Sequence, residues 1–131
     1  MDVKKHKDKI KILIVEDDEA VRETLSFIFV SREYAVEEAG NGKEALEKIS
    51  KNKPHIILLD AMMSVMDGFE TYRQLRANPD TRNIPIIFCT ATHIDKLKKG
   101  KVRVDDYIEK PFSVETLCKK INRALKRKKK G

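Results

Sequence analysis

The chain has 131 residues, of which 40% are hydrophobic and 37% charged, and this fits one globular domain. No apolar run approaches the length needed to span a bilayer, and the N-terminus is too polar for a signal peptide. We therefore expect a cytoplasmic protein without membrane contact. The net charge of +7 gathers at the ends, because residues 1–11 carry five Lys and residues 126–131 carry five Lys or Arg. We expect both ends to be disordered and solvated, since runs of like charge seldom form specific nucleic-acid sites.

The first half of the chain alternates aliphatic runs with segments of helical periodicity. Apolar residues recur at helical spacing from Val21 to Phe29, which predicts a helix. Asn41 and Asp67 each precede a Glu by three residues, so each is expected to cap a further helix. Short apolar runs predict the strands between these helices, and they are Lys11–Val15, Tyr34–Ala39 and Ile56–Leu59.

The second half continues the alternation. Ile84–Cys89 predicts a fourth strand, which is the third of the buried aliphatic kind, and Tyr107–Ile108 predicts a last, short one. Residues 93–99 are compatible with a short helix. Ser113 is expected to cap a final helix whose apolar face comprises Val114, Leu117, Cys118, Ile121 and Leu125. Cys89 and Cys118 fall within these apolar patterns, so we expect two buried thiols rather than a disulfide or a metal site.

Strands that are apolar at consecutive positions are buried on both faces. The alternation of such strands with amphipathic helices predicts an α/β fold, with a parallel sheet covered by helices on both sides. Functional side chains of such folds gather at the carboxyl ends of the strands. The polar residues that follow the predicted strands are Glu16, Asp17 and Asp18, then Asp60, Thr90 and Lys110.

These residue types suit phosphoryl transfer assisted by a metal ion. Clustered carboxylates repel one another, and a hard divalent cation such as Mg²⁺ relieves that repulsion. Asp60 can act as an oxygen nucleophile that forms an acyl phosphate, with Lys110 and the metal neutralising charge. Taken singly, each residue has a plainer explanation: Asp18 as a helix N-cap, Asp60 as a turn residue, Thr90 as a capping hydroxyl and Lys110 as a surface charge. Their joint occurrence at matching strand ends favours the functional interpretation.

Four stretches together resemble the response-regulator receiver family of two-component signalling. They are Ile12–Glu19 (ILIVEDDE), Leu59–Gly68 (LDAMMSVMDG), Thr90–Ala91 and Asp106–Phe112 (DYIEKPF). The resemblance covers residues 10–127, with basic extensions at 1–9 and 128–131. It implies a flavodoxin-like, doubly wound (βα)5 fold with the strand order 2-1-3-4-5.

The resemblance also implies a role for each site residue. Asp60 would be the phosphoacceptor. Mg²⁺ would bind Asp60 and Asp17 directly, Glu16 through water, and the Met62 backbone carbonyl. The remaining roles would be phosphoryl contact by Thr90 and Lys110, an aromatic switch at Tyr107, a cis peptide at Lys110–Pro111, and control of the phosphate lifetime by Met62 and Thr92.

The family's partners are expected here as well. The implied donor is a sensor histidine kinase or a phosphotransfer protein, and the implied receiver of the signal is a downstream effector or output domain. The domain would be no enzyme beyond slow self-catalysed dephosphorylation, and it would be a monomer or a weak, phosphorylation-linked dimer. Ser64 stands where the family usually has Pro, and the interval from Thr90 to Lys110 is short, so the fourth helix is expected to differ from the family pattern.

Other functions fit the sequence less well. Dehalogenase-type phosphatases have an Asp-x-Asp motif after the first strand. Here the candidate nucleophile Asp60 follows the third strand, and the residue two positions later is Met62 rather than Asp. A dinucleotide-binding domain would need a Gly-rich turn after the first strand, and none is present. No helix-turn-helix follows residue 127, so sequence-specific DNA binding has no visible element. One alternative stays open: the chain could be a receiver fragment of a longer DNA-binding or enzymatic response regulator.

Overall fold

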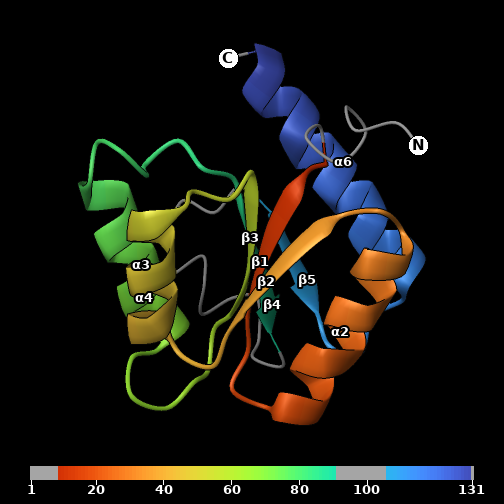
Figure 1. The fold of residues 1–131 in the computed structure, drawn as a ribbon, viewed down its shortest axis with the longest axis horizontal. Coiled ribbons are helices and arrows are strands. Elements are labelled where there is room, and N and C mark those ends of the chain that lie inside the picture. Colours follow the sequence, from red (N-terminus) through yellow and green to blue (C-terminus); the bar gives the residue numbers. More distant parts are fainter. Residues whose placement is uncertain (1–8, 91–105, 131) are drawn as a thin grey trace.

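The computed structural model describes residues 9–90 and 106–130. Five strands and four helices follow one another in this part of the chain (Figure 1). Their bounds are β1 Lys11–Val15, α2 Glu19–Ser31, β2 Ala35–Ala39, α3 Gly42–Lys51, β3 Ile56–Asp60, α4 Gly68–Ala77, β4 Ile86–Thr90, β5 Asp106–Glu109 and α6 Val114–Lys130. No helix among them is both long and apolar enough to cross a bilayer.

The strands form one sheet in the order β2-β1-β3-β4-β5, and every neighbouring pair is parallel. The predicted flavodoxin-like order is therefore confirmed. Val15 lies opposite Leu59 in the register, Asp60 opposite Cys89, and Thr90 opposite Glu109. This register brings the carboxyl ends of β1, β3, β4 and β5 to one edge of the sheet.

The core consists of two layers, one on each face of the sheet. Figure 1 shows α3 and α4 on one side and α2 and α6 on the other. Alternate residues of β1 and β3 point to opposite layers, so that Leu13 and Ile57 pack towards α3 and α4 while Ile14 and Leu58 pack towards α2 and α6. All five residues of β3 are buried. Burial of each such aliphatic side chain contributes about 1.5–3 kcal/mol, which explains why this strand has no polar residue before Asp60.

Side-chain caps fix where the helices begin. The Asp18 carboxylate accepts hydrogen bonds from the backbone N–H groups of Ala20 and Val21, so its expected role as an N-cap is confirmed. Three other side chains cap helices in the same way, each accepting from the backbone N–H three residues later. The pairs are Asn41 with Glu44, Asp67 with Glu70, and Ser113 with Thr116. Each cap satisfies a backbone donor that has no partner within its helix. All four caps follow a loop that leaves the carboxyl end of a strand, so these helices begin at that edge of the sheet.

Several predicted boundaries were wrong by one or two residues. β4 begins at Ile86 rather than Ile84, because Pro85 has no N–H for the ladder and the Ile84 N–H bonds to the Thr81 carbonyl. β2 begins at Ala35 because the Tyr34 N–H closes the end of α2 at the Phe29 carbonyl. β5 is longer than predicted by one residue at each end.

The expectation of a disordered basic C-terminus was wrong for residues 126–130. α6 continues through Lys130, and Figure 1 shows its last turns extending past the sheet. Lys and Arg are good helix formers, and no Gly or Pro interrupts the run before Gly131. The expected helix over residues 93–99 and the N-terminal residues 1–8 lie outside the described part of the chain.

Candidate metal centre

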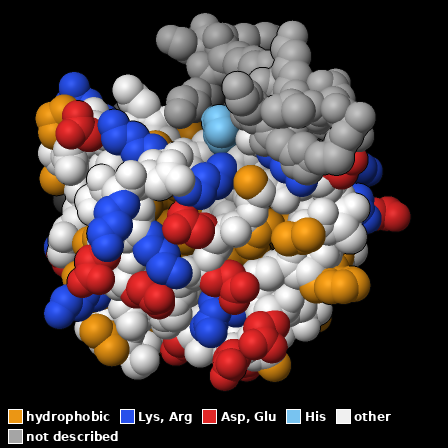
Figure 2. Space-filling model, in the orientation of Figure 1, with side chains coloured by type: hydrophobic (Ala, Val, Ile, Leu, Met, Phe, Trp, Pro, Cys, Tyr) orange, Lys and Arg blue, Asp and Glu red, His pale blue; other side chains and the backbone are white. Residues whose placement is uncertain are grey.

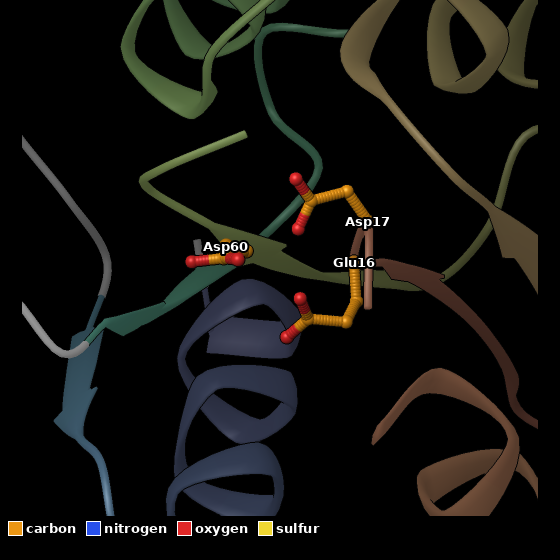
Figure 3. Close-up of side chains that lie close together, drawn as sticks. All are labelled: Glu16, Asp17 and Asp60. Atoms are coloured by element: carbon orange, nitrogen blue, oxygen red, sulfur yellow. The ribbon is translucent and has the colours of Figure 1, made fainter. Parts of the chain in front are cut away.

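Three carboxylates meet at the carboxyl edge of the sheet. Glu16 and Asp17 directly follow β1, and Asp60 is the last residue of β3 (Figure 3). One oxygen of each carboxylate lies within 4.8 Å of an oxygen of the other two. The next helix packs tightly against this edge, since a Cβ on Gly68 would lie 2.3 Å from the Asp60 carbonyl oxygen. Glycine is thus required at the start of α4, and it brings the β3–α4 loop close to the acidic group.

Glu16 is the most firmly held of the three. Glu16 is 4% exposed, and its Oε1 lies 2.7 Å from Lys110 Nζ. The Asp18 N–H donates to Oε2 at 3.2 Å. Burial opposes ionisation of the side chain, but the Lys110 hydrogen bond, the Asp18 N–H and a bond with Asp60 together lower the pKa of Glu16. Glu16 is therefore a carboxylate at neutral pH.

Asp60 has the opposite shift. It is 6% exposed, accepts from the Met62 N–H at 3.2 Å, and its Oδ2 lies 3.8 Å from Lys110 Nζ. Burial and the neighbouring Glu16 carboxylate raise its pKa to about 7, because together they outweigh the lowering effects of Lys110 and the Met62 N–H. Without a cation the pair thus holds a proton on Asp60 near neutral pH. A divalent cation would replace that proton and free Asp60 as a nucleophile.

Asp17 and Lys110 complete the site. Asp17 is exposed, and its Oδ2 accepts a 3.4 Å hydrogen bond from the Ser64 N–H, which ties β1 to the β3–α4 loop. An ion could therefore reach the buried pair from the side of Asp17. Burial lowers the pKa of Lys110, but the hydrogen bond to Glu16 and the charges of both acids raise it overall, so Lys110 stays a cation. The predicted cis peptide at Lys110–Pro111 is confirmed.

This donor set fits a small, hard cation. All of its ligand atoms are oxygens, and two of the three carboxylates are buried beside each other. The single ammonium of Lys110 offsets only part of their charge. Among the described residues, Glu16, Asp17 and Asp60 are the one group of acids, His and Cys close enough to hold a metal ion.

The other predicted site residues lie as follows. Met62 lies two residues past Asp60 and is 58% exposed. Tyr107 lies half-buried on β5 beside the α3–α4 layer, and its ring centroid is 5.9 Å from Lys120 Nζ. Thr90 ends β4, but its side chain and the whole of Thr92 lie outside the described part of the chain.

Sequence reasoning missed Arg22, whose Nη1 donates to the Glu16 backbone carbonyl at 2.8 Å. No pattern in the sequence pointed to it, because its partner is a main-chain oxygen. It also missed the role of Gly68. Its place straight after the capping Asp67 was the one available signal, since a glycine at the start of a helix often marks a close backbone approach.

The fold and the site define a flavodoxin-like α/β domain with an acidic centre at the carboxyl edge of its sheet. The chain matches the response regulator receiver domain over residues 12–122, and it belongs to that family. The predicted family is thereby confirmed. Response regulator MprA of Mycobacterium sp. (strain KMS) is 39% identical over 120 residues, which are 90% of this chain and 51% of the relative. The chain thus spans about half the length of the curated relatives it matches.

Solved structures agree with this assignment. The receiver domain of a signal transduction histidine kinase from Syntrophus aciditrophicus is 35% identical, with a TM-score of 0.82 over 88% of this chain and 89% of that one. The receiver domain of a sensor histidine kinase from Pseudomonas aeruginosa PAO1 is 27% identical, with a TM-score of 0.82 over 89% of this chain and 98% of that one. That second structure has a magnesium ion coordinated in its active site cleft.

Proposed function

We propose that this receiver domain accepts a phosphoryl group on Asp60 in a Mg²⁺-dependent reaction, as part of a two-component phosphorelay. The observation that carries the proposal is the buried pair of Glu16 and Asp60 beside the Lys110 ammonium, with Asp17 open to solvent. Asp60, Asp17 and the Met62 carbonyl would hold the ion directly, and Glu16 would hold it through water. The magnesium in the similar Pseudomonas domain supports the choice of metal.

In the proposed reaction, an Asp60 oxygen forms a bond to phosphorus while the bond from phosphorus to the donor breaks. With a phosphohistidine donor the leaving group is the ring nitrogen, and the product is an acyl phosphate. When bound, Mg²⁺ would neutralise charge on the phosphoryl oxygens. Lys110 Nζ lies 3.8 Å from Asp60 Oδ2, so its ammonium would be close enough to contact a phosphoryl group on Asp60. Glu16 keeps Lys110 charged and in place, which is the positioning that this chemistry mainly needs.

Intact-mass measurement after incubation with acetyl phosphate and Mg²⁺ tests the proposal. We expect one added phosphoryl group on the unchanged protein, and none on Asp60→Asn or in the presence of a chelator. Asp80→Asn is the matched control, since Asp80 is an exposed carboxylate in the α4–β4 loop, and it should be modified like the unchanged protein. Equal phosphorylation of Asp60→Asn would contradict the proposal.

The signal is proposed to leave through residues 93–99, β5 and α6. Tyr107 would turn inward when Thr90 contacts the phosphoryl group, so that phosphorylation shifts a two-state population. Tyr107 lies on β5, beside the α3–α4 layer and within reach of Lys120 on α6, which supports a switch role. Amide NMR shifts on phosphorylation should then cluster in residues 90–112, and shifts restricted to the acidic site would count against it.

The partners would be a sensor histidine kinase or phosphotransfer protein and a downstream effector, met in the cytoplasm. The domain itself would be a monomer or a weak, phosphorylation-linked dimer. We propose no sequence-specific nucleic-acid contact, because the basic end of α6 is a single cationic run without aromatic interleaving.

A second candidate is the same chemistry within a longer response regulator. The observation that favours it is that the matched relatives are about twice as long as the stretch they share with this chain. The genomic reading frame decides the matter: codons for a further domain beyond Gly131 would support this candidate, and a stop codon there would contradict it.

A further inference from the structure

We propose that Arg22 is a positioning residue for the metal centre: its guanidinium clamps the main chain of Glu16 and thereby sets where the Glu16 and Asp17 carboxylates lie. The inference rests on the proposed Mg²⁺ site and extends it to a residue in the first turns of α2. Arg22 touches neither the proposed ion nor the phosphoryl group, and it acts through the backbone.

The contacts of Arg22 join three elements. Its Nη1 donates to the Glu16 carbonyl at 2.8 Å, and its Nε donates to Glu38 Oε1 on β2 at 3.1 Å. Its own N–H bonds to the Asp18 carbonyl in the first turn of α2. The side chain is 19% exposed, so these bonds are partly shielded from water. One planar cation thus ties the end of β1 to both α2 and β2.

Both main-chain polar groups of Glu16, the N–H and the carbonyl, are hydrogen-bonded. Its N–H continues the sheet by donating to the Ala39 carbonyl at 3.0 Å. Its carbonyl lies just past the end of β1, and it accepts the hydrogen bond from Arg22 Nη1. Because Asp17 follows on the next peptide unit, this carbonyl fixes the plane from which the Asp17 side chain departs.

Further charged side chains lie near the guanidinium and its partner Glu38. Lys48 on α3 donates to the Glu38 carbonyl and lies 3.5 Å from Glu44, whose carboxylate accepts from the Gly40 N–H. Arg22 contributes to the lowered pKa of Glu44, after the larger effect of the Gly40 N–H. Figure 2 shows acidic and basic side chains interleaved over the half of this face where Figure 1 places α3. Each of these ion pairs contributes little to stability by itself, and the two bonds of the guanidinium to Glu16 and Glu38 carry the inference.

Position and charge predict opposite effects on metal affinity. If Arg22 acted only through its charge, its removal would strengthen Mg²⁺ binding, since one repelling cation would be lost. If it acts by holding Glu16, its removal weakens binding, because the carboxylates lose their arrangement. Residues that orient metal ligands typically contribute about 10–100-fold in affinity.

The test measures Mg²⁺ affinity by calorimetry on the unphosphorylated protein, and the free energy of unfolding in urea without Mg²⁺. We expect Arg22→Gln to bind Mg²⁺ about tenfold more weakly. Arg22→Lys keeps the charge but cannot make both bonds, and it should also bind more weakly. Lys11→Gln is the matched control: it removes one positive charge, at the start of β1, from an ion pair with Glu37 on β2, and the Lys11 side chain is 16% exposed. Its affinity should not fall.

The outcomes separate this inference from the proposed function. Failure of the unchanged protein to bind Mg²⁺ would overturn both. Mg²⁺ binding by the unchanged protein, with equal or tighter binding by Arg22→Gln and Arg22→Lys, would overturn the inference alone. If Arg22→Gln does not fold, Arg22→Lys decides, because weaker binding at unchanged charge cannot come from electrostatic repulsion.

Discussion

Glu16 and Asp60 are adjacent carboxyl groups whose pKa values are shifted in opposite directions. The protonated form of Asp60 is favoured by burial and by Glu16, so its pKa lies near 7, far above the value of 3.8 expected in the unfolded chain. Such a group stabilises the fold below its unfolded pKa, and this contribution is lost as the pH rises through the folded pKa. The pKa of Glu16 is lowered and that of Lys110 is raised, so both groups stay charged while Asp60 loses its proton.

We therefore expect the protein without Mg²⁺ to lose stability between about pH 4 and pH 7, by a few kcal/mol at most, since one pKa unit corresponds to about 1.4 kcal/mol. Saturating Mg²⁺ should remove most of this loss by binding only the folded state. Urea unfolding at several pH values, with and without Mg²⁺, measures the effect. Asp60→Asn should abolish the pH dependence in this window, and an unchanged dependence in that variant would assign it to another group.

We expect Met62 to influence a second property at this scale, the lifetime of the proposed phosphorylated form. Met62 is 58% exposed two residues past Asp60, and its thioether is only a weak acceptor for orienting an attacking water. We expect Met62→Asn with Thr92→Glu to lose phosphate about tenfold faster, which is about 1.4 kcal/mol of barrier. Loss of label over time measures the rate, and Met62→Leu should remain slow. If the unchanged protein loses phosphate as fast as the double variant, neither position controls the lifetime.

At the scale of elements, the β3–α4 loop contains an unfavourable backbone conformation. Val65 has φ 69° and is 80% exposed, although β-branched residues rarely adopt this left-handed region. Asn tolerates it, and the exposed Val side chain has few contacts to lose. Val65→Asn should raise the free energy of unfolding by about 1 kcal/mol, measured in urea.

The matched control for this change is Val30→Asn. Val30 is 57% exposed but lies in helical backbone on α2, so the same replacement should give no gain. Equal effects of the two substitutions would show that removal of an exposed apolar side chain, rather than relief of the backbone at Val65, explains any increase.

The strands and helix starts were predictable because their causes are local. Consecutive aliphatic residues mark β1 and β3, and Asn41, Asp67 and Ser113 mark helix starts by the backbone donors they accept from. The end of α6 was not predictable from charge alone, since helix propensity outweighed the repulsion within the basic run. The left-handed Val65 had no signal, because neither Gly nor Asn stands there.

At the scale of the whole molecule, the position of the acidic centre followed from one rule about the edge of a parallel sheet. The rule predicted that Glu16, Asp17 and Asp60 lie close together, and they do. The register of β1 against β3 explains this, because it aligns the carboxyl ends of the two strands. The rule could not give the pairing of Glu16 with Lys110 across 94 residues, nor the bond from Arg22 to a main-chain oxygen. Those contacts depend on side-chain paths in the folded chain, which no spacing in the sequence records.

The sheet also contains a buried thiol whose labelling rate can report how often the sheet opens. Cys89 lies opposite Asp60 in the register, and burial raises the pKa of its thiol to about 12. Thiolates rather than thiols attack disulfide reagents, so at pH 8 Cys89 should react only in molecules whose β3–β4 pairing has transiently separated. In a Cys118→Ser background, which removes the half-buried second thiol, the labelling rate should fall on addition of Mg²⁺. Labelling as rapid as that of a free cysteine would mean that the centre of the sheet opens far more often than its packing implies.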